Sequence, residues 1–337
     1  MTIVIQVRPD RPQEEIIERA AAIIRGSGLV AFPTETVYGL GADAMNESAV
    51  QKIFEAKGRP ADNPLIVHVG GKRDVERVAD EISEMAWDLI ERFWPGPLTL
   101  VLKRRPDVAR SVSAGLPTVA VRMPGNVVAL GLIRKAGTPI AAPSANLSGR
   151  PSPTSAAHVA RDLDGRIDMI LDGGATDIGI ESTVLDMTTD SPAILRPGWI
   201  TEECLSGIIA LHGRAAAPEE LRRSPGTRHR HYSPRARVIL VEQRAPRSIE
   251  RLLKTYLDQG PVGLIGHTPV DVDDPRLYAV IVGGGASDYA RSIYAALREL
   301  DERNPSVILV EGINERGEGR AVMDRLRRAA SEIISGD

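Results

Sequence analysis

Two short apolar runs, residues 29–32 and 65–69, flank a segment rich in glycine, hydroxyl and basic side chains. Each run is bounded by proline or polar residues, which predicts a buried strand on either side of the segment. Residues 34–41 follow the first strand, and Lys57 and Arg59 shortly precede the second. Loops at strand ends of an open α/β sheet usually hold the ligand, and two cations can pair with an anion. The segment therefore predicts an anion-binding site built on an α/β sheet.

The rest of the N-terminal part mixes helical patterns with strands that follow one another directly. Helices are expected at residues 13–25, 48–56, 74–93, 126–136 and 201–211, and further strands at residues 98–102, 118–122, 139–143, 169–172, 182–187 and 193–196. Asn46 is expected to cap the helix that ends beside Lys57. Strands that are not separated by helices indicate a mixed sheet rather than a purely parallel one.

Residues 213–237 differ in composition from the chain on either side. They are rich in arginine, and prolines and glycines interrupt regular structure, which is typical of a linker. Strands then alternate with helices at residues 238–241, 248–257, 262–266, 278–282, 287–300, 307–310 and 320–334. This pattern predicts a parallel sheet covered by helices. We therefore expect an N-terminal domain at residues 1–211, a linker at 212–236 and a smaller Rossmann-like α/β domain at 237–337.

Composition narrows the class of function. The 337 residues carry a net charge of −3 with a pI near 6.1, which argues against a protein that binds nucleic acid through an overall positive charge. Only 4% of the residues are aromatic, so an extended surface for stacking nucleic-acid bases is not expected either. The single cysteine, Cys204, falls in a helical pattern and is expected to be a buried structural thiol in a reducing compartment. No apolar run is long enough to span a bilayer and no signal-peptide pattern is present, so a cytoplasmic protein with no membrane partner is predicted.

Several familiar site motifs are absent or out of context. There is no GxxxxGK[ST] phosphate-binding loop. Residues 39–44 do match the GxGxx(G/A) dinucleotide-binding pattern, but they lie too far beyond the end of the strand for that kind of site to be expected. The histidines are scattered, which argues against a structural zinc site. Ser144 lacks a GxSxG context and an evident base partner, so covalent acyl chemistry is not expected. The three glycines at 283–285 suit a tight turn better than an anion site.

What the sequence offers instead is a set of hydroxyl, amide and basic side chains at or beside predicted strand ends. They are Thr34, Lys57, Arg59, Asn63, His68, Thr118, Arg122, Ser144, Asn146, Ser148, Ser152, Ser182, Thr183 and Arg196. Arg122 and Arg196 each end an otherwise apolar strand, where a guanidinium needs a partner and suits a carboxylate or phosphate. Because these cations lack matching acids, we expect a polyanionic ligand such as a nucleoside triphosphate.

These segments closely resemble one family, the YrdC-like L-threonylcarbamoyladenylate synthases in their longer, two-domain form. The matching motifs are FPTETVYGLG (32–41), KGRP (57–60), NPLIVH (63–68), WPGPLT (94–99), VRMP (121–124), APSANLSG (142–149), ESTV (181–184), LRPG (195–198) and SPGTRHRHYSP (224–234). The resemblance covers residues 10–210 and the linker, and the C-terminal residues match in pattern and position. It implies the YrdC-like twisted mixed sheet with flanking helices for the N-terminal domain.

The resemblance implies an enzyme, a nucleotidyltransferase that converts L-threonine, bicarbonate (or CO₂) and ATP into L-threonylcarbamoyl-AMP and pyrophosphate. A tRNA threonylcarbamoyl transferase then uses this product to make N6-threonylcarbamoyladenosine at tRNA position 37. Mg²⁺ is expected to arrive with ATP, held mainly by the phosphates and not by protein side chains, and no organic cofactor is expected. A weak direct contact with tRNA stays open, as do the role of the C-terminal domain and the oligomeric state.

The family's site residues carry over position by position. The L-threonine site corresponds to Thr34, His68, Arg122, the Ala142 backbone and Ser182, and the ATP site to Arg59, Asn63, Thr118, Ser144, Ser152, Arg196 and Tyr232, with Lys57 beside the phosphates. Lys57, Arg59 and Arg122 are the expected catalytic residues, acting by positioning and charge stabilisation. The resemblance implies that the linker, with Tyr232, closes over the site and excludes water. His68 is a candidate for the group that deprotonates threonine.

Two other classes of function compete with this one. A YrdC-like domain could serve as an RNA-binding or ribosome-maturation protein, which the acidic pI and scarce aromatics disfavour. A carbamoyl-adenylate enzyme of metalloenzyme maturation would carry zinc-finger-like and acylphosphatase modules. The chain has neither the cysteines nor the N-terminal length for such modules.

Overall fold

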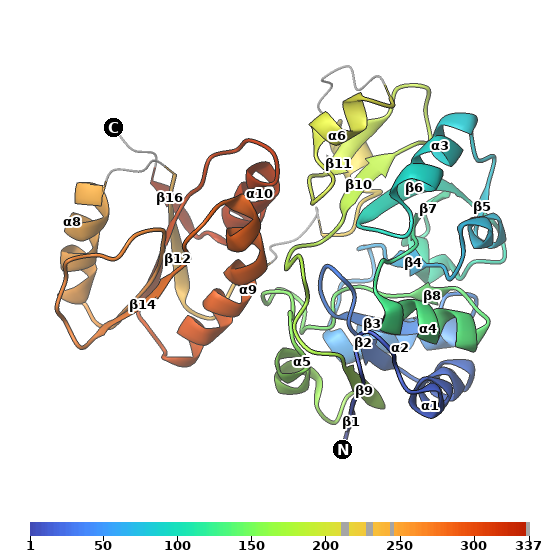
Figure 1. Cartoon of the computed structure of the whole chain (residues 1–337), viewed down its shortest axis with the longest axis horizontal. Coiled ribbons are helices and arrows are strands. Elements are labelled where there is room, and N and C mark those ends of the chain that lie inside the picture. Colours follow the sequence, from blue (N-terminus) through green and yellow to red (C-terminus); the bar gives the residue numbers. More distant parts are fainter. Residues whose placement is uncertain (210–215, 227–231, 243–245, 335–337) are drawn as a thin grey trace. The chain divides into compact units, whose positions relative to one another are not determined.

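The structure, a computed structural model, describes residues 1–209, 216–226, 232–242 and 246–334, which form two compact units (Figure 1). The first unit comprises Met1–Ser148, Pro153–Asp177 and Glu181–Arg228. The second comprises Gly149–Ser152, Ile178–Ile180 and His229–Asp337. Two short segments that precede the linker in the sequence therefore belong to the second unit.

The first unit is built on one mixed sheet. Among the described residues its strands run in the order β1 (Ile3–Gln6), β9 (Met169–Asp172), β2 (Val30–Phe32), β3 (Gly39–Asp43), β8 (Ile140–Ala141), β4 (Ile66–His68), β7 (Thr118–Arg122), β6 (Leu98–Arg104), β10 (Thr183–Asp186) and β11 (Ala193–Arg196), with β5 (Ala79–Asp80) paired to β6. Parallel pairs such as β4 with β7 adjoin antiparallel pairs such as β6 with β7. The predicted mixed sheet is confirmed.

Helices cover this sheet on both faces. They are α1 (Glu14–Arg25), α2 (Glu47–Lys57), α3 (Glu84–Phe93), α4 (Val127–Ala136), α5 (Ala156–Leu163), α6 (Glu202–Ser206) and α7 (Pro218–Leu221), with 3₁₀ helices η1 (Lys72–Arg77) and η2 (Arg110–Ser113). Strand side chains alternate between the faces. On one face, α2, α3 and α5 pack over Leu40, Val67 and Val121 in the largest apolar cluster.

The opposite face of the sheet carries two separate apolar clusters. The side chains of α1 and α4 cover Phe32 and Ile140 in the first, and α1 and α4 lie side by side (Figure 1). The second is smaller and includes Ile66, Ala120 and Val184. His68 and Arg122 lie two positions beyond Ile66 and Ala120 on their strands, so they occupy this same face.

The second unit has a sheet whose strands are all parallel among the described residues. Their order is β14 (Leu277–Ile281), β13 (Val262–Gly266), β15 (Val307–Glu311), β12 (Arg237–Val241) and β16 (Glu332–Ile334). Helix α8 (Pro246–Leu257) covers one face, while α9 (Ala286–Glu302) and α10 (Gly319–Ala329) cover the other (Figure 1). This is the small parallel α/β architecture that the strand–helix alternation predicted.

Several element boundaries differ from the prediction. The expected helix at 74–93 is divided into η1, β5 and α3, because Glu81 adopts a positive φ of 53° and Ser83 then caps α3 by accepting from the Ala86 N–H. The expected helix at 201–211 is shorter, since α6 ends at Ser206 and residues 210–211 lie outside the described chain. The helix expected to reach residue 334 ends at Ala329 and is followed by β16. The linker, expected to be irregular, contains α7.

Candidate active site

Most of the predicted threonine-site residues gather where the ends of β4 and β7 adjoin the beginnings of β6 and β10, whereas the ATP candidate Thr118 lies at the opposite end of β7. His68 and Arg122 are register partners in the parallel pair β4–β7. The Ala142 N–H donates to the carbonyl of Ile66 at 2.9 Å, so Ala142 lies beside β4 as well. Thr183 pairs with Leu98 at the beginnings of β10 and β6, which places Ser182 there. The sheet thus brings four of the five predicted threonine-site residues to neighbouring strand positions.

A chain of hydrogen bonds runs from Arg122 into the loop after β2. Nη1 of Arg122 donates to Oγ1 of Thr36 at 2.9 Å, and the Thr36 and Thr34 hydroxyls lie 2.8 Å apart. Oγ1 of Thr34 donates to the carbonyl of Val37 at 2.7 Å, so the Thr36 hydroxyl must donate to Thr34. The side chains of Arg122, Thr36 and Thr34 are all buried. The loop holding Thr34 is therefore fixed to the strand end that carries Arg122.

Arg122 also has an acidic partner that the sequence did not single out. Oε1 of Glu35 lies 2.6 Å from Nη2 of Arg122, while Nε of Arg122 donates to the carbonyl of Gly96 at 3.1 Å. The expectation that this arginine lacks a matching acid is therefore wrong. The available signal was local, because Glu35 is the one acid in the threonine-rich loop after the strand at 29–32.

His68 is buried, with the aromatic ring of Phe32 nearby and Arg122 opposite it on the neighbouring strand. The two rings are 6.3 Å apart in an edge-to-face arrangement. Burial, reinforced by the positive charge of Arg122, lowers the pKa of His68 to about 3. The imidazole is therefore neutral at physiological pH, and a base this weak cannot draw a proton from an ammonium group. This pKa argues against His68 as the group that deprotonates threonine.

Ser182 and Arg196 link the predicted threonine and ATP positions. Nη2 of Arg196 donates to the carbonyl of Ser182 at 3.0 Å and to its hydroxyl at 3.2 Å. The Ser182 hydroxyl is also 2.8 Å from the hydroxyl of Thr99 on β6. Nη1 of Arg196 donates to the carbonyl of Pro225 at 3.2 Å, so the part of the linker that belongs to the first unit contacts this arginine.

Lys57 is almost fully buried at the end of α2. Asn46 begins this helix as predicted, accepting from the N–H groups of Ser48 and Ala49. Nζ of Lys57 donates to the carbonyl of Ser144 at 2.5 Å and to the carbonyl of Asn146. The Ser144 hydroxyl in turn donates to Oδ1 of Asn146 at 2.6 Å. Lys57 thus shapes the loop that carries the predicted ATP contact Ser144.

Arg59 and Asn63 are buried in the loop between α2 and β4. Nε of Arg59 donates to the carbonyl of Asn63 at 3.1 Å, and Nη2 donates to the carbonyl of Pro64 at 2.8 Å. Oδ1 of Asn63 accepts from the N–H of Gly226 at 3.2 Å. Asn63 and Arg196 therefore contact consecutive residues of the linker, Gly226 and Pro225. Thr118, the remaining ATP candidate of this unit, begins β7 and is buried.

Ser152 and Tyr232 belong to the second unit. Tyr232 is buried there with a positive φ of 65°, its ring stacked 5.3 Å from the ring of Tyr294 and 5.7 Å from the guanidinium of Arg325. Ser152 is buried as well. Residues 210–215 and 227–231 of the linker lie outside the described chain, so the closure of the linker over the site stays a prediction.

Cys204 is exposed on α6, with the Thr201 hydroxyl directed to its sulfur at 3.5 Å. The expectation of a buried thiol is therefore wrong. The helix is short and only its Leu205 side is buried, so the helical pattern placed the cysteine on the solvent-facing side. No helix in the described chain is long and apolar enough to cross a bilayer.

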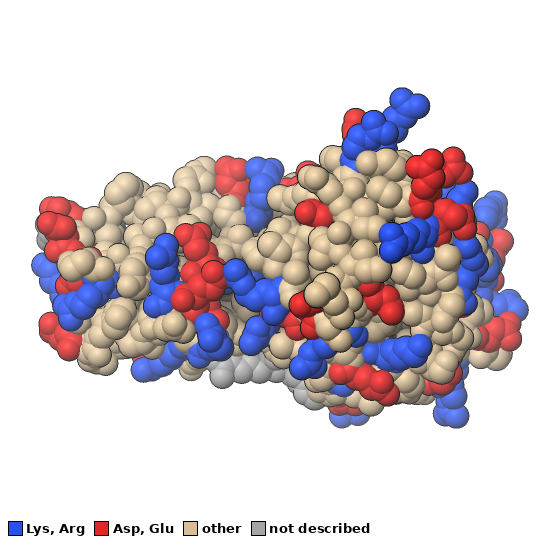
Figure 2. Space-filling model, turned by 90° about the horizontal axis from the view of Figure 1, so that it is seen from below, with Lys and Arg blue, Asp and Glu red and all other residues tan. Residues whose placement is uncertain are grey.

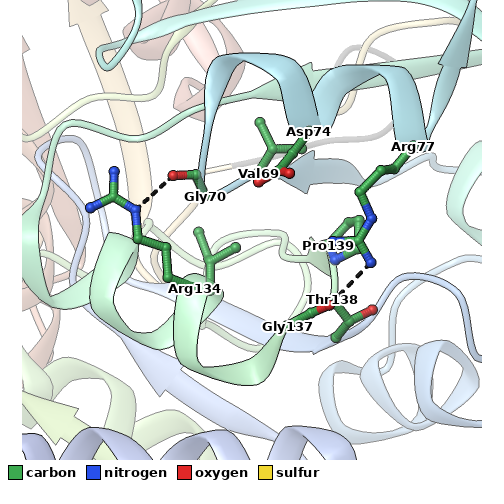
Figure 3. A pocket seen from close by; sticks show the side chains of 9 residues that line it. Val69, Gly70, Asp74, Arg77, Arg134, Gly137, Thr138 and Pro139 are labelled. Atoms are coloured by element: carbon green, nitrogen blue, oxygen red, sulfur yellow. Dashed lines mark hydrogen bonds between the residues drawn. The ribbon is translucent and has the colours of Figure 1, made fainter.

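The described residues include no cluster of three His, Cys, Asp or Glu side chains that could hold a metal. Mg²⁺ brought by ATP and held mainly by the phosphates stays a prediction. A pocket of about 220 Å³ does lie beside the sheet, between η1 and the end of α4 (Figure 3). Its two arginines are engaged with backbone, since Arg134 donates to the Gly70 carbonyl and Arg77 to the Gly137 carbonyl. None of the candidate residues lines this pocket.

Surface charge bears on the RNA-binding alternative. On the face shown in Figure 2, basic and acidic side chains are interspersed, and neither sign forms a continuous patch. Across the described chain, several arginines and lysines are paired with nearby acids, as in Lys135 with Glu14 and Arg276 with Asp274. This face therefore presents no extended basic surface for a nucleic-acid backbone.

The fold and the site together define a class: an α/β protein with two units, in which the larger mixed sheet carries a buried ligand site of cations and hydroxyls. A model of the Sua5/YciO/YrdC family, described as "Telomere recombination", matches residues 22–198. A second model, described as "Threonylcarbamoyl-AMP synthase, C-terminal domain", matches residues 200–331. The chain belongs to the Sua5/YciO/YrdC family, in its two-domain form.

Curated relatives match along nearly the whole chain. A threonylcarbamoyl-AMP synthase of Pyrococcus abyssi is 49% identical, covering 99% of each chain. One of Bacillus subtilis is 47% identical over 93% of this chain and 92% of its own. The crystal structure of P. abyssi Sua5 complexed with L-threonine superposes with a TM-score of 0.93 at 48% identity, covering 100% of both chains.

Proposed function

We propose that this protein is a threonylcarbamoyl-AMP synthase that joins L-threonine, bicarbonate and ATP into L-threonylcarbamoyl-AMP and pyrophosphate. The observation that carries the proposal is the buried cluster of Arg122, Thr34, His68, Ser182 and Arg196 at adjoining strand ends. A relative of 48% identity and the same fold was solved with L-threonine bound. In cells the product would feed a tRNA threonylcarbamoyl transferase, and the cytoplasm remains the proposed location.

The proposed reaction needs no protein nucleophile. The threonine amine, once its ammonium has lost a proton, forms a bond from nitrogen to the carbon of bicarbonate or CO₂. With bicarbonate the C–OH bond breaks and water leaves, and with CO₂ the nitrogen loses one further proton. Either route gives an N-carboxylate. An oxygen of this carboxylate then bonds to the α-phosphorus of ATP, while the bond from that phosphorus to the bridging oxygen of the pyrophosphate breaks. AMP is thereby transferred to the carboxylate, which makes the enzyme a nucleotidyltransferase.

The residues of the site suit this chemistry by their charge and their rigidity. Two mutually repelling anions have to be brought together, and fixed donors achieve this better than mobile water. Arg122 is proposed to receive the threonine carboxylate, with Thr34 and Ser182 reading its polar groups. Lys57, Arg59 and Arg196 are proposed to carry phosphate charge. Their bonds to backbone carbonyls hold them in place before substrate arrives.

The test is pyrophosphate release from ATP by the purified protein, with threonine and bicarbonate each present or omitted. We expect release only with both co-substrates and a product with the mass of threonylcarbamoyl-AMP. Arg122→Ala and Tyr232→Phe should each lower the rate, the second through the proposed closing linker. Pyrophosphate release that does not depend on threonine, together with salt-sensitive tRNA binding in the absence of ATP, would support the RNA-binding alternative instead.

A further inference from the structure

Glu35 contributes a buried carboxylate to the site. Its Oε1 faces Nη2 of Arg122 at 2.6 Å, and the two side chains are 12% and 4% exposed. Both carboxylate oxygens, Oε1 and Oε2, are buried and neither accepts a hydrogen bond in the part of the chain that the structure describes. Buried carboxylate oxygens without a donor are unfavourable, so this carboxylate suits a cationic group of a ligand.

Arg122 keeps capacity for a second anion beside Glu35. A guanidinium has five N–H donors. In this structure Nε donates to Gly96 and Nη1 to Thr36, while Nη2 is paired with Glu35 by charge at 2.6 Å and makes no hydrogen bond in the described chain. Nη1 and Nη2 each carry one more N–H, and such a pair is what a carboxylate accepts from an arginine.

We propose that Glu35 and Arg122 form a clamp for the zwitterionic end of threonine, with Glu35 receiving the ammonium and Arg122 the carboxylate. This inference rests on the proposed function, because it takes threonine as the ligand. With the zwitterion bound, the charges of the clamp and the ligand sum to zero. A ligand without the ammonium would place two carboxylates on one buried guanidinium, which a low-dielectric site disfavours. Glu35 is then a specificity-determining residue.

The test compares two ligands by isothermal titration calorimetry, without ATP. L-Threonine is compared with (R)-3-hydroxybutyrate, which keeps the carboxylate and the hydroxyl but lacks the ammonium. The wild type should prefer threonine by roughly 10- to 100-fold, the range expected for one charge-assisted contact. Glu35→Gln should weaken threonine binding by a similar factor and leave hydroxybutyrate binding unchanged or tighter. The preference for threonine should therefore collapse.

Controls separate this proposal from simpler explanations. Glu18→Gln makes the same change at an exposed acid paired with Arg25 and should alter neither affinity. Glu35→Asp keeps the negative charge and should keep a preference for threonine. An unchanged preference in Glu35→Gln, or tighter threonine binding there, would refute the clamp.

The wild type alone also decides the question if Glu35→Gln does not fold. Equal affinity of the wild type for threonine and hydroxybutyrate would overturn the proposal without any variant. If the wild type binds no threonine at all, the proposed function itself fails, which is a different outcome from loss of the clamp.

Discussion

Arg196 donates to both the carbonyl and the hydroxyl of Ser182, at 3.0 and 3.2 Å, so a predicted phosphate-binding residue holds a predicted threonine-binding residue in place. Arg196→Lys replaces the planar fork with a single point charge. We expect kcat/KM to fall roughly 10- to 100-fold, with higher KM values for both threonine and ATP. Steady-state pyrophosphate release measures both constants. Arg276→Lys, at an exposed ion pair, is the matched control and should leave them unchanged. An effect of Arg196→Lys on the ATP constant alone would contradict the coupling.

The depressed pKa of His68 predicts how stability changes with pH. The unfolded chain protonates this histidine near its ordinary pKa of 6.5, whereas the folded chain does so only near 3. Between these values the unfolded state binds more protons, so the contribution of His68 is complete above pH 6.5 and is lost as the pH falls toward 3. From pH 6.5 to 5, the wild type should lose about 2 kcal/mol more than His68→Asn. Urea unfolding at the two pH values measures this difference, and equal losses would contradict the depressed pKa.

Lys57 supports the loop with Ser144 through two backbone carbonyls. Lys57→Met removes the ammonium and leaves the buried carbonyl of Asn146 and the part-buried carbonyl of Ser144 without this donor, which should lower the free energy of unfolding by about 1–3 kcal/mol. The KM for ATP should rise in parallel because the loop carries Ser144. Lys52→Met is the control, since Lys52 lies on the same helix and donates to the Ser27 carbonyl from an exposed position. Its effect on stability should be smaller, and its KM for ATP should equal that of the wild type.

Gly179 packs against the backbone of α9 within the second unit. Its φ is +85°, and a Cβ there would lie 2.5 Å from the carbonyl oxygen of Ala290 and from Cα of Arg291. Gly179→Ala should therefore lower the free energy of unfolding by about 1–3 kcal/mol or more, through overpacking and backbone strain. Gly283→Ala is the control in the same unit, because a Cβ there meets nothing within 4 Å and its φ is ordinary. Thermal unfolding compares the two variants. Equal midpoints would contradict the prediction, because they would show that α9 shifts to accommodate the methyl group at little cost.

The sequence predicted the architecture well where periodicity was strong. Residues 118–122, 169–172, 193–196 and 262–266 form strands with the expected bounds. Prediction from the sequence missed strand β3. Residues 39–43 pair with β2 and β8, but they are rich in glycine and lack the side chains that indicate a strand. Prediction from the sequence also missed the ion pair at the site, where two segments that are distant in the sequence meet. The Glu35–Arg122 contact joins residues far apart in the sequence, and the local signal, a single acid in the loop after the strand at 29–32, does not identify Arg122 as its partner.

The second unit includes Gly149–Ser152 and Ile178–Ile180, two segments that interrupt the first unit in sequence. Within it, the buried Arg298 of α9 donates to the carbonyl of Pro151 at 3.2 Å from Nε and 2.5 Å from Nη2, and the carbonyl of Gly149 accepts from the Ser233 N–H. The border between the units is therefore not one point on the chain. A hybrid of two relatives joined only at the linker would pair Arg298 with a foreign loop, so residues 149–152 and 178–180 have to be exchanged together with the C-terminal half.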